Sequence, residues 1–160
     1  MNYPYGSDEF NIDIDIRRQF IFYASDKKLA LVLEKLAHMS VNITGILVAK
    51  DKSRKNFVRL VAGAPDGQTQ ESLRAARRIL HNLGIRYKEI EIIVANTETP
   101  AGVPGFINQI YGLLWCRTEV KALFFGEENA IFITVSDVRK AIEALTQHCA
   151  RRCSTDSYCD

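Results

Sequence analysis

The order in which two kinds of apolar pattern alternate along the chain constrains its fold more than any single motif does. Short runs rich in β-branched and aromatic residues, typical of buried strands, occur at residues 20–23, 41–48, 57–61 and 90–95. Between them lie two stretches in which apolar residues recur every three or four positions, as on one face of a helix. This part of the chain therefore predicts the element order βαββαβ.

Local signals mark the ends of both predicted helices. Ser25 or Asp26 can cap the first helix and Thr69 the second, because these side chains accept hydrogen bonds from unpaired first-turn amides. Gly84 is placed to end the second helix in a left-handed conformation. The apolar stripes consist of Leu29, Val32, Leu33 and Leu36, and of Leu73, Ala76, Leu80 and Leu83. Two such helices can cover one face of a four-stranded antiparallel sheet, the ferredoxin-like arrangement.

The rest of the chain repeats this pattern without a first strand of its own. Strand 90–95 is followed by a Pro/Gly-rich turn, an apolar helix, strands at 120–125 and 130–135, and a helix capped by Ser136 or Asp137. No linker separates the halves, so we expect one strand to serve both.

The expected fold is α+β: two fused ferredoxin-like βαββαβ units with antiparallel sheets and helices packed on one face. The expected divisions are a flexible leader at 1–13, a first unit at 14–97, a second unit at 90–147 that shares the strand 90–95, and a Cys-containing tail at 148–160.

Charge and hydropathy limit the partners. With 21 Lys and Arg against 19 Asp and Glu, the net charge of +2 does not by itself imply nucleic acid or an anionic membrane. No apolar run approaches the roughly 20 residues of a membrane-spanning helix, and the N-terminal residues lack the pattern of a secretory signal. We expect a cytoplasmic protein that binds no membrane.

The four cysteines do not predict a disulfide scaffold. Cys116 lies in an apolar helical pattern, where a free thiol behaves as a small hydrophobe. Cys149, Cys153 and Cys159 crowd the C-terminus beside His148, which leaves a zinc clip as an alternative to a tail with reactive thiols. Because no CxxC is present and the spacing matches no common zinc module, we expect no metal site.

Enzymatic motifs are missing from the sequence. The three histidines are scattered, and none stands near a Ser or Cys in the strand-turn context of a nucleophile. There is no GxxxxGK[ST] motif, and Gly102 and Gly105 do not form GxGxxG. We therefore expect a protein that is not an enzyme and has no cofactor.

Nucleic acid is not an expected partner either. The basic turn at 50–55 lacks interleaved aromatic residues, and the predicted strand around Phe57 carries a single ring where RNA-binding sheets carry several. An RNA-binding ferredoxin-like module is kept as a second alternative.

The candidate ligand site is the Pro/Gly-rich turn before the third helix. A helix N-terminus presents unpaired N–H groups and a partial positive charge, which attract a carboxylate. Glycines there allow close approach, polar side chains can supply hydrogen bonds, and apolar ones can form a wall. The predicted ligand-binding residues are Asn96, Thr97, Thr99, Gly102, Val103, Pro104, Gly105 and Phe106.

This turn within a βαββαβ pattern resembles the ACT domain, a small-molecule-sensing module attached to enzymes of amino-acid metabolism. The segment 96–106 looks like that family's strand end, polar turn, Pro-Gly and apolar helix start. The segment 129–142 looks like the strand and final helix of tandem ACT proteins. The resemblance covers residues 17–147 and implies that an amino acid binds at such a turn, often against a neighbouring unit's strand.

The function that the resemblance implies is regulatory: a stand-alone tandem ACT-type sensor without a catalytic domain, which binds an amino acid. Open sheet edges need covering, so we also expect a homodimer. A ligand-free dimerisation or protein-interaction module is the first alternative.

Overall fold

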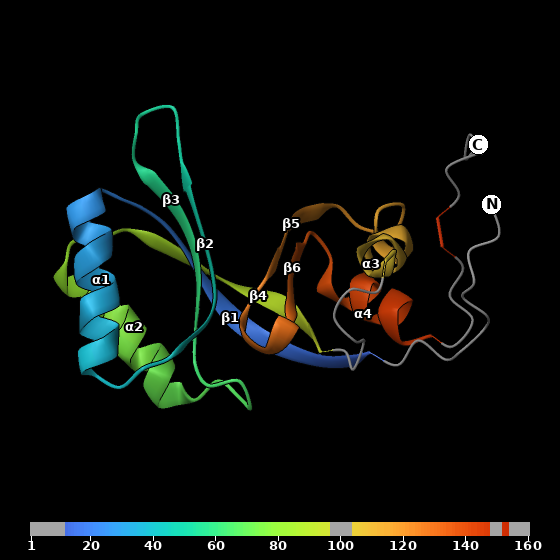
Figure 1. The fold of residues 1–160 in the computed structure, drawn as a ribbon, viewed down its shortest axis with the longest axis horizontal. Helices are drawn as coiled ribbons and strands as arrows, with labels where there is room; N and C mark the ends of the chain where they lie inside the picture. The colour runs from blue at the N-terminus through green and yellow to red at the C-terminus, as the bar shows by residue number, and fades with distance from the viewer. Residues whose placement is uncertain (1–11, 97–103, 148–151, 154–160) are drawn as a thin grey trace.

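One antiparallel sheet with strand order β2-β3-β1-β4-β6-β5 runs through the molecule (Figure 1). The computed structural model describes residues 12–96, 104–147 and 152–153. The strands are β1 Asp13–Ala24, β2 Ile43–Lys50, β3 Asn56–Ala62, β4 Tyr87–Asn96, β5 Val120–Phe125 and β6 Ile131–Val135. The helices are α1 Asp26–His38, α2 Gln70–Asn82, α3 Phe106–Leu114 and α4 Val138–Thr146, with a short 3-10 turn η1 at Glu127–Asn129.

Two long strands belong to both halves of the fold. β1 and β4 pair from Asp13 opposite Asn96 to Phe22 opposite Tyr87. Near one end of this ladder β1 also pairs with β3, and near the other end β4 also pairs with β6. The first unit is therefore β2-β3-β1-β4 with α1 and α2, and the second is β1-β4-β6-β5 with α3 and α4.

The sharing of β4 follows the pairing expected from the sequence, but the sharing of β1 was missed. The sequence predicts a strand only at 20–23, whereas β1 already begins at Asp13, and Ile12 before it is buried. The start of β1 supplies the second unit with the fourth strand that its own sequence lacks. The residue boundaries of the two units stay a prediction.

The caps of the helices agree with the predicted ones. The side chains of Ser25, Thr69 and Asp137 accept hydrogen bonds from backbone amides three residues further on. Gly84 has φ +62°, the left-handed conformation that follows the end of α2.

Both helix pairs cover the same face of the sheet. Even-numbered residues of β1 face them, because Phe20 and Phe22 pack in the core under α1 and α2, while Ile12 and Ile14 pack in the core under α3 and α4. In Figure 1 the two helix pairs lie at opposite ends of the molecule. The expected placement of the helices on one face is confirmed.

α2 is also held to the sheet by charge. Arg77 donates two hydrogen bonds of 2.7 and 2.8 Å to the carboxylate of Glu89 on β4, and Arg18 donates a third of 3.1 Å. The hydrogen bonds from Arg77 hold the pKa of Glu89 below its usual value.

The other face of the sheet, called the helix-free face because the described helices pack on the opposite side, curls inward. It carries its own apolar cluster, formed by Val61, Ile92, Val94, Phe124, Ala130 and Phe132. The edge strand β2 approaches the turn after β5 so closely that a Cβ on Gly126 would lie 2.3 Å from the carbonyl oxygen of Thr44. Asn42 donates a hydrogen bond of 2.8 Å to Glu127 across the same contact. The sheet therefore curls until its two edges meet at this point.

A disulfide corrects the prediction for two cysteines. Cys116, expected as a free thiol, is bonded to Cys153 with an S–S distance of 2.01 Å. The Cys153 amide donates a hydrogen bond of 2.6 Å to the carbonyl of Gly112. Partners that are 37 positions apart leave no local signal in the sequence, whereas Cys149 and Cys159 lie outside the described residues.

The sequence predicts neither a metal site nor a membrane-spanning helix, and the structure bears on both within the residues that it describes. Among these residues no group of three or more His, Cys, Asp or Glu side chains is placed to hold a metal ion. Within the same ranges, no helix has the length and apolar character that crossing a membrane requires.

Removing the disulfide is expected to cost stability. Cys116→Ser should lower the free energy of unfolding by about 2–4 kcal/mol, because an unfolded chain without the cross-link gains conformational entropy. Urea denaturation measures this loss. Cys153→Ser and the double variant serve as matched controls, since all three changes remove one bond and should lose the same amount. A double variant that loses the sum of both single losses contradicts the bond.

Candidate functional site

The structure describes half of the predicted ligand-binding residues. Asn96 ends β4, and Pro104, Gly105 and Phe106 lead into α3. The remaining predicted residues, Thr97, Thr99, Gly102 and Val103, lie outside the described residues.

Gly105 is the N-cap of α3 and adopts φ +89°, which favours glycine. As a glycine, this N-cap residue supplies no side-chain hydrogen bond to the helix, and a Cβ at Gly105 would meet nothing within 4 Å. Pro104 and Gly105 are both exposed. α3 therefore begins at an exposed glycine, and the backbone conformation alone already explains a glycine at this position.

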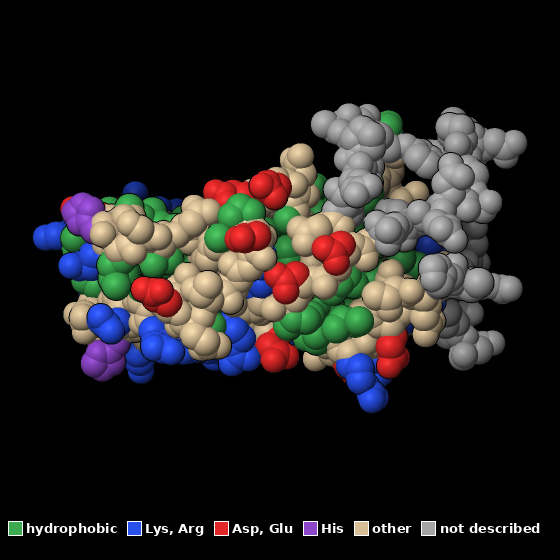
Figure 2. Space-filling model, turned by 90° about the horizontal axis from the view of Figure 1, so that it is seen from below, with side chains coloured by type: hydrophobic (Ala, Val, Ile, Leu, Met, Phe, Trp, Pro, Cys, Tyr) green, Lys and Arg blue, Asp and Glu red, His purple; other side chains and the backbone are tan. Residues whose placement is uncertain are grey.

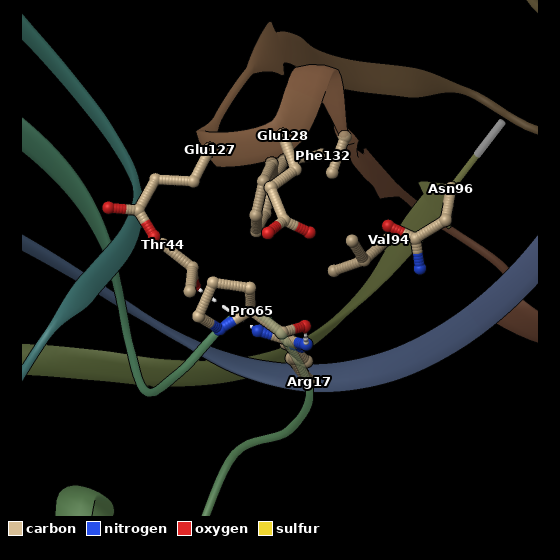
Figure 3. Close-up of a pocket in the computed structure, with 9 residues that line it drawn as sticks. Arg17, Thr44, Pro65, Val94, Asn96, Glu127, Glu128 and Phe132 are labelled. Carbon is tan, nitrogen blue, oxygen red and sulfur yellow. Dashed lines mark hydrogen bonds between the residues drawn. The ribbon is translucent and has the colours of Figure 1, made fainter. Parts of the chain in front are cut away.

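The structure separates the two ends of the predicted site. Phe106 packs against the core under α3 and α4, on the helix-covered face. Asn96 instead lines a cleft on the helix-free face, together with Arg17, Thr44 and Glu128 (Figure 3). Asn96 and Phe106 thus contribute to different surfaces.

The cleft forms where the curled sheet closes. β1 and β4 provide its floor, β2 one wall, and the turn η1 the other. It encloses about 230 Å³ including the part open to solvent. The residues that line it are Arg17, Thr44, Pro65, Val94, Asn96, Glu127, Glu128, Ala130 and Phe132.

Arg17 lies at the bottom of the cleft with 3% of its side chain exposed. Its guanidinium donates to Asp15 at 2.7 Å and to the carbonyls of Ala64 and Pro65 at 2.8 and 2.6 Å. A fourth hydrogen bond of 3.3 Å reaches the hydroxyl of Thr44. These bonds neutralise the buried cation and tie the turn after β3 to the sheet, so Arg17 shapes the cleft.

Acidic side chains stand above this floor. Glu127 and Glu128 both belong to η1, and Figure 3 shows the Glu128 carboxylate pointing into the cleft. Glu128 has φ +55°, a left-handed conformation uncommon for a residue with a side chain. With Asp15 already bonded to Arg17, the carboxylates of η1 give the mouth of the cleft a surplus of negative charge.

The chemistry of this arrangement suits binding. Carboxylates can hold an ammonium group, and the amide of Asn96 can donate and accept hydrogen bonds. Sequence reasoning reached Asn96 because it ends a strand before the Pro/Gly-rich turn. It missed Arg17, Thr44 and Glu128, since only the curl of the sheet brings β1, β2 and η1 together.

Comparison with known proteins finds its matches among solved structures. No family model matches the chain, and no curated protein sequence matches it significantly. Protein BT0572 from Bacteroides thetaiotaomicron matches with a TM-score of 0.60 at 18% identity, over 84% of this chain and 88% of that one. The ligand-free regulatory subunit of aspartate kinase from Thermus thermophilus matches with a TM-score of 0.58 at 13% identity, over 88% of this chain and 98% of that subunit.

The chain has the fold of an aspartate kinase regulatory subunit. Escherichia coli aspartokinase III in complex with lysine and aspartate shares this fold over 86% of the chain, which spans 32% of that larger protein, with a TM-score of 0.50 at 14% identity. The resemblance to tandem ACT proteins that the sequence suggested is confirmed for the fold. At these identities the regulatory-subunit fold is what the likeness shows.

Loss of Arg17 is expected to open this end of the regulatory-subunit fold. Arg17→Met should lower the free energy of unfolding by about 2–4 kcal/mol, because it leaves the carbonyls of Ala64 and Pro65 without their donor in a buried place. The charge of Asp15 adds little, as that side chain is 42% exposed. Urea denaturation is the measurement, and Arg78→Met on the exposed side of α2 is the control, expected within about 0.5 kcal/mol of wild type. Equal losses in both variants would contradict a stabilising role for the Arg17 hydrogen bonds.

Proposed function

We propose that this chain is a regulatory protein that binds an amino acid and carries no catalytic activity of its own. The observation that supports it is the extent of the shared fold: 88% of this chain corresponds to 98% of a separate regulatory subunit of aspartate kinase. The correspondence is with a whole subunit, so nearly every element of that neighbour has a counterpart here.

The proposed ligand site is the segment 96–106. The start of α3 after Gly105 is a separate candidate position for an α-carboxylate, because the helix dipole favours negative charge there. Asn96 lies at the other end of the segment, on the opposite face of the sheet, and we place the ligand at that end. Its amide is the described side chain that we expect to hold the ligand, beside the carboxylates of the acidic cleft. The neighbour whose structure holds lysine and aspartate makes an amino acid the chemical class to test first.

A second candidate function is a ligand-free interaction or dimerisation module. Tyr111 and Trp115 lie one turn apart on α3 with 48% and 41% of their surface exposed. Large exposed aromatic side chains are typical of protein contacts. Homodimerisation is part of either proposal.

The disulfide bears on the location of the protein. A reducing cytoplasm keeps most thiols unpaired, so a cytoplasmic chain would hold Cys116 and Cys153 reduced for much of the time. The cytoplasmic location stays a prediction, and the redox state of these two residues in cells is the observation that tests it.

The test of the proposed function is calorimetric titration of the purified chain with each of the twenty amino acids. We expect at least one to bind, with affinity falling about tenfold or more in Asn96→Ala, because a hydrogen bond to a charged group is lost. Glu143→Gln on the exposed side of α4 is the matched control and should bind as wild type does.

Failure of all twenty to bind contradicts the sensor proposal. Light scattering on the same preparation then decides the alternative: a dimer that dissociates in Trp115→Ala favours the interaction module. Binding that is unchanged in Asn96→Ala would move the site away from the segment 96–106.

A further inference from the structure

Two aromatic rings lie side by side on the helix-free face, at the end where β1 leads into α1. This end, which carries Tyr23, Phe57, Arg59 and Lys88, is called the open end of the face. Tyr23 on β1 and Phe57 on β3 are direct cross-strand partners, with ring centroids 5.2 Å apart. Tyr23 is 53% exposed, and the four described helices pack on the other face of the sheet. β1 and β3 are the two central strands of the first unit, so the rings stand midway across its sheet, next to the last residue pair of the two strands.

A positively charged side chain, Arg59, lies beside this pair of rings. The Arg59 guanidinium lies 5.2 Å from the centroid of the Phe57 ring. It donates to the neutral side chains of Gln19 at 3.0 Å and Thr134 at 3.3 Å, and none of the described carboxylates lies within ion-pair distance of it. Arg59 therefore presents an oriented positive charge whose described contacts are all neutral groups.

More cations surround the rings. Lys88 on β4 is exposed and shares the helix-free face, since it pairs with Ile21 of β1. The turn that joins β2 to β3 carries Lys52, Arg54 and Lys55, directly before the strand that holds Phe57. By strand alternation, the charged side chains on this end of the face are Arg59 and Lys88, both positive.

The two units differ in net charge, and the small net charge of the whole chain does not show this difference. The predicted first unit, residues 14–97, contains 15 Lys and Arg against 8 Asp and Glu, whereas residues 90–147 contain 4 against 7. Figure 2 shows most Lys and Arg side chains gathered over the end that holds α1 and α2, and the acidic ones mainly over the middle and the other end. A positive field is thus concentrated on the unit that exposes the rings.

We propose that the open end of the helix-free face binds single-stranded nucleic acid. A base stacks on the exposed ring of Tyr23, with Phe57 packed against its side, and Arg59, Lys88 and the turn at 52–55 contact phosphates. Aromatic rings on the central strands of a ferredoxin-like sheet, flanked by cations, are the features by which such sheets hold unpaired bases. An acidic peptide would satisfy the charges but would leave the ring pair unused.

The experiment is fluorescence anisotropy with labelled RNA and DNA oligonucleotides of about 12 nucleotides, a length within the usual site size. In salt of about 50 mM we expect saturable binding that weakens as salt rises, since phosphate contacts release counterions. Tyr23→Ala should weaken binding about 5- to 100-fold, the range for loss of one stacked base. Tyr23→Phe keeps the ring and should bind as wild type does.

Matched controls separate stacking from general effects. Phe125→Ala removes a ring of similar exposure, 54%, on β5 in the second unit and should leave the affinity unchanged. Lys88→Glu should weaken binding, whereas Lys140→Glu on α4 should not. Circular dichroism checks that each variant folds. RNA that binds more tightly than DNA of the same sequence identifies contacts to the 2′-hydroxyl.

Several results would overturn the proposal. No saturable binding of either oligonucleotide at low salt would do so, as would equal losses in Tyr23→Ala and Phe125→Ala. Binding of a poly-glutamate peptide without binding of an oligonucleotide would assign the face to an acidic protein. A dimer that dissociates in Tyr23→Ala, with no oligonucleotide bound, would assign it to a second copy of this chain. Amino-acid titration of Tyr23→Ala tests the proposed function separately, since Tyr23 lies outside the segment 96–106.

Discussion

The pairing of β1 with β4 is the constraint on which the rest of the structure depends. The ladder runs from Asp13 opposite Asn96 to Phe22 opposite Tyr87, longer than either unit needs for itself. One end of each of these strands lies in the first unit and the other end in the second, so each unit needs both strands to complete its part of the sheet. The helix pairs can cover one common face, and the opposite face can curl, because a single continuous ladder sets the direction of all the strands.

The curl gives the helix-free face two different regions. At its centre the edges meet, and buried polar groups lie beside an apolar cluster: Arg17 is bonded to two backbone carbonyls, and Gln19 accepts hydrogen bonds from Arg59 and Thr134. Toward the start of α3 this region opens as an acidic cleft at Asn96. Toward the start of α1 the face is basic, with Tyr23 exposed and Phe57 half-buried beside it. A positive surface and a negative cleft on one face suit two ligands of different chemistry.

Local chemistry was readable from the sequence, and long-range geometry was not. Ser25, Thr69 and Asp137 cap helices because a side-chain oxygen and a backbone amide three residues away are close in any such chain. The start of β1 was missed because polar Arg17 and Gln19 interrupt its apolar pattern, and only the curled sheet gives them buried partners. The Cys116–Cys153 bond, and the meeting of Thr44 with Glu128 in one cleft, depend on distances that no local pattern encodes. In the same way, the net charge of +2 for the whole chain does not reveal that the first unit is basic and the second acidic.

Native-state hydrogen exchange tests the central claim, that two shared strands join the units into one cooperative structure. Amides of β3 in the first unit and of β6 in the second are expected to exchange with the same free energy of opening. The reason is that release of either strand exposes the β1–β4 ladder, which both units require. If β6 opens at a free energy about 2 kcal/mol or more below that of β3 while β1 stays fully protected, the units fold independently and the account is contradicted.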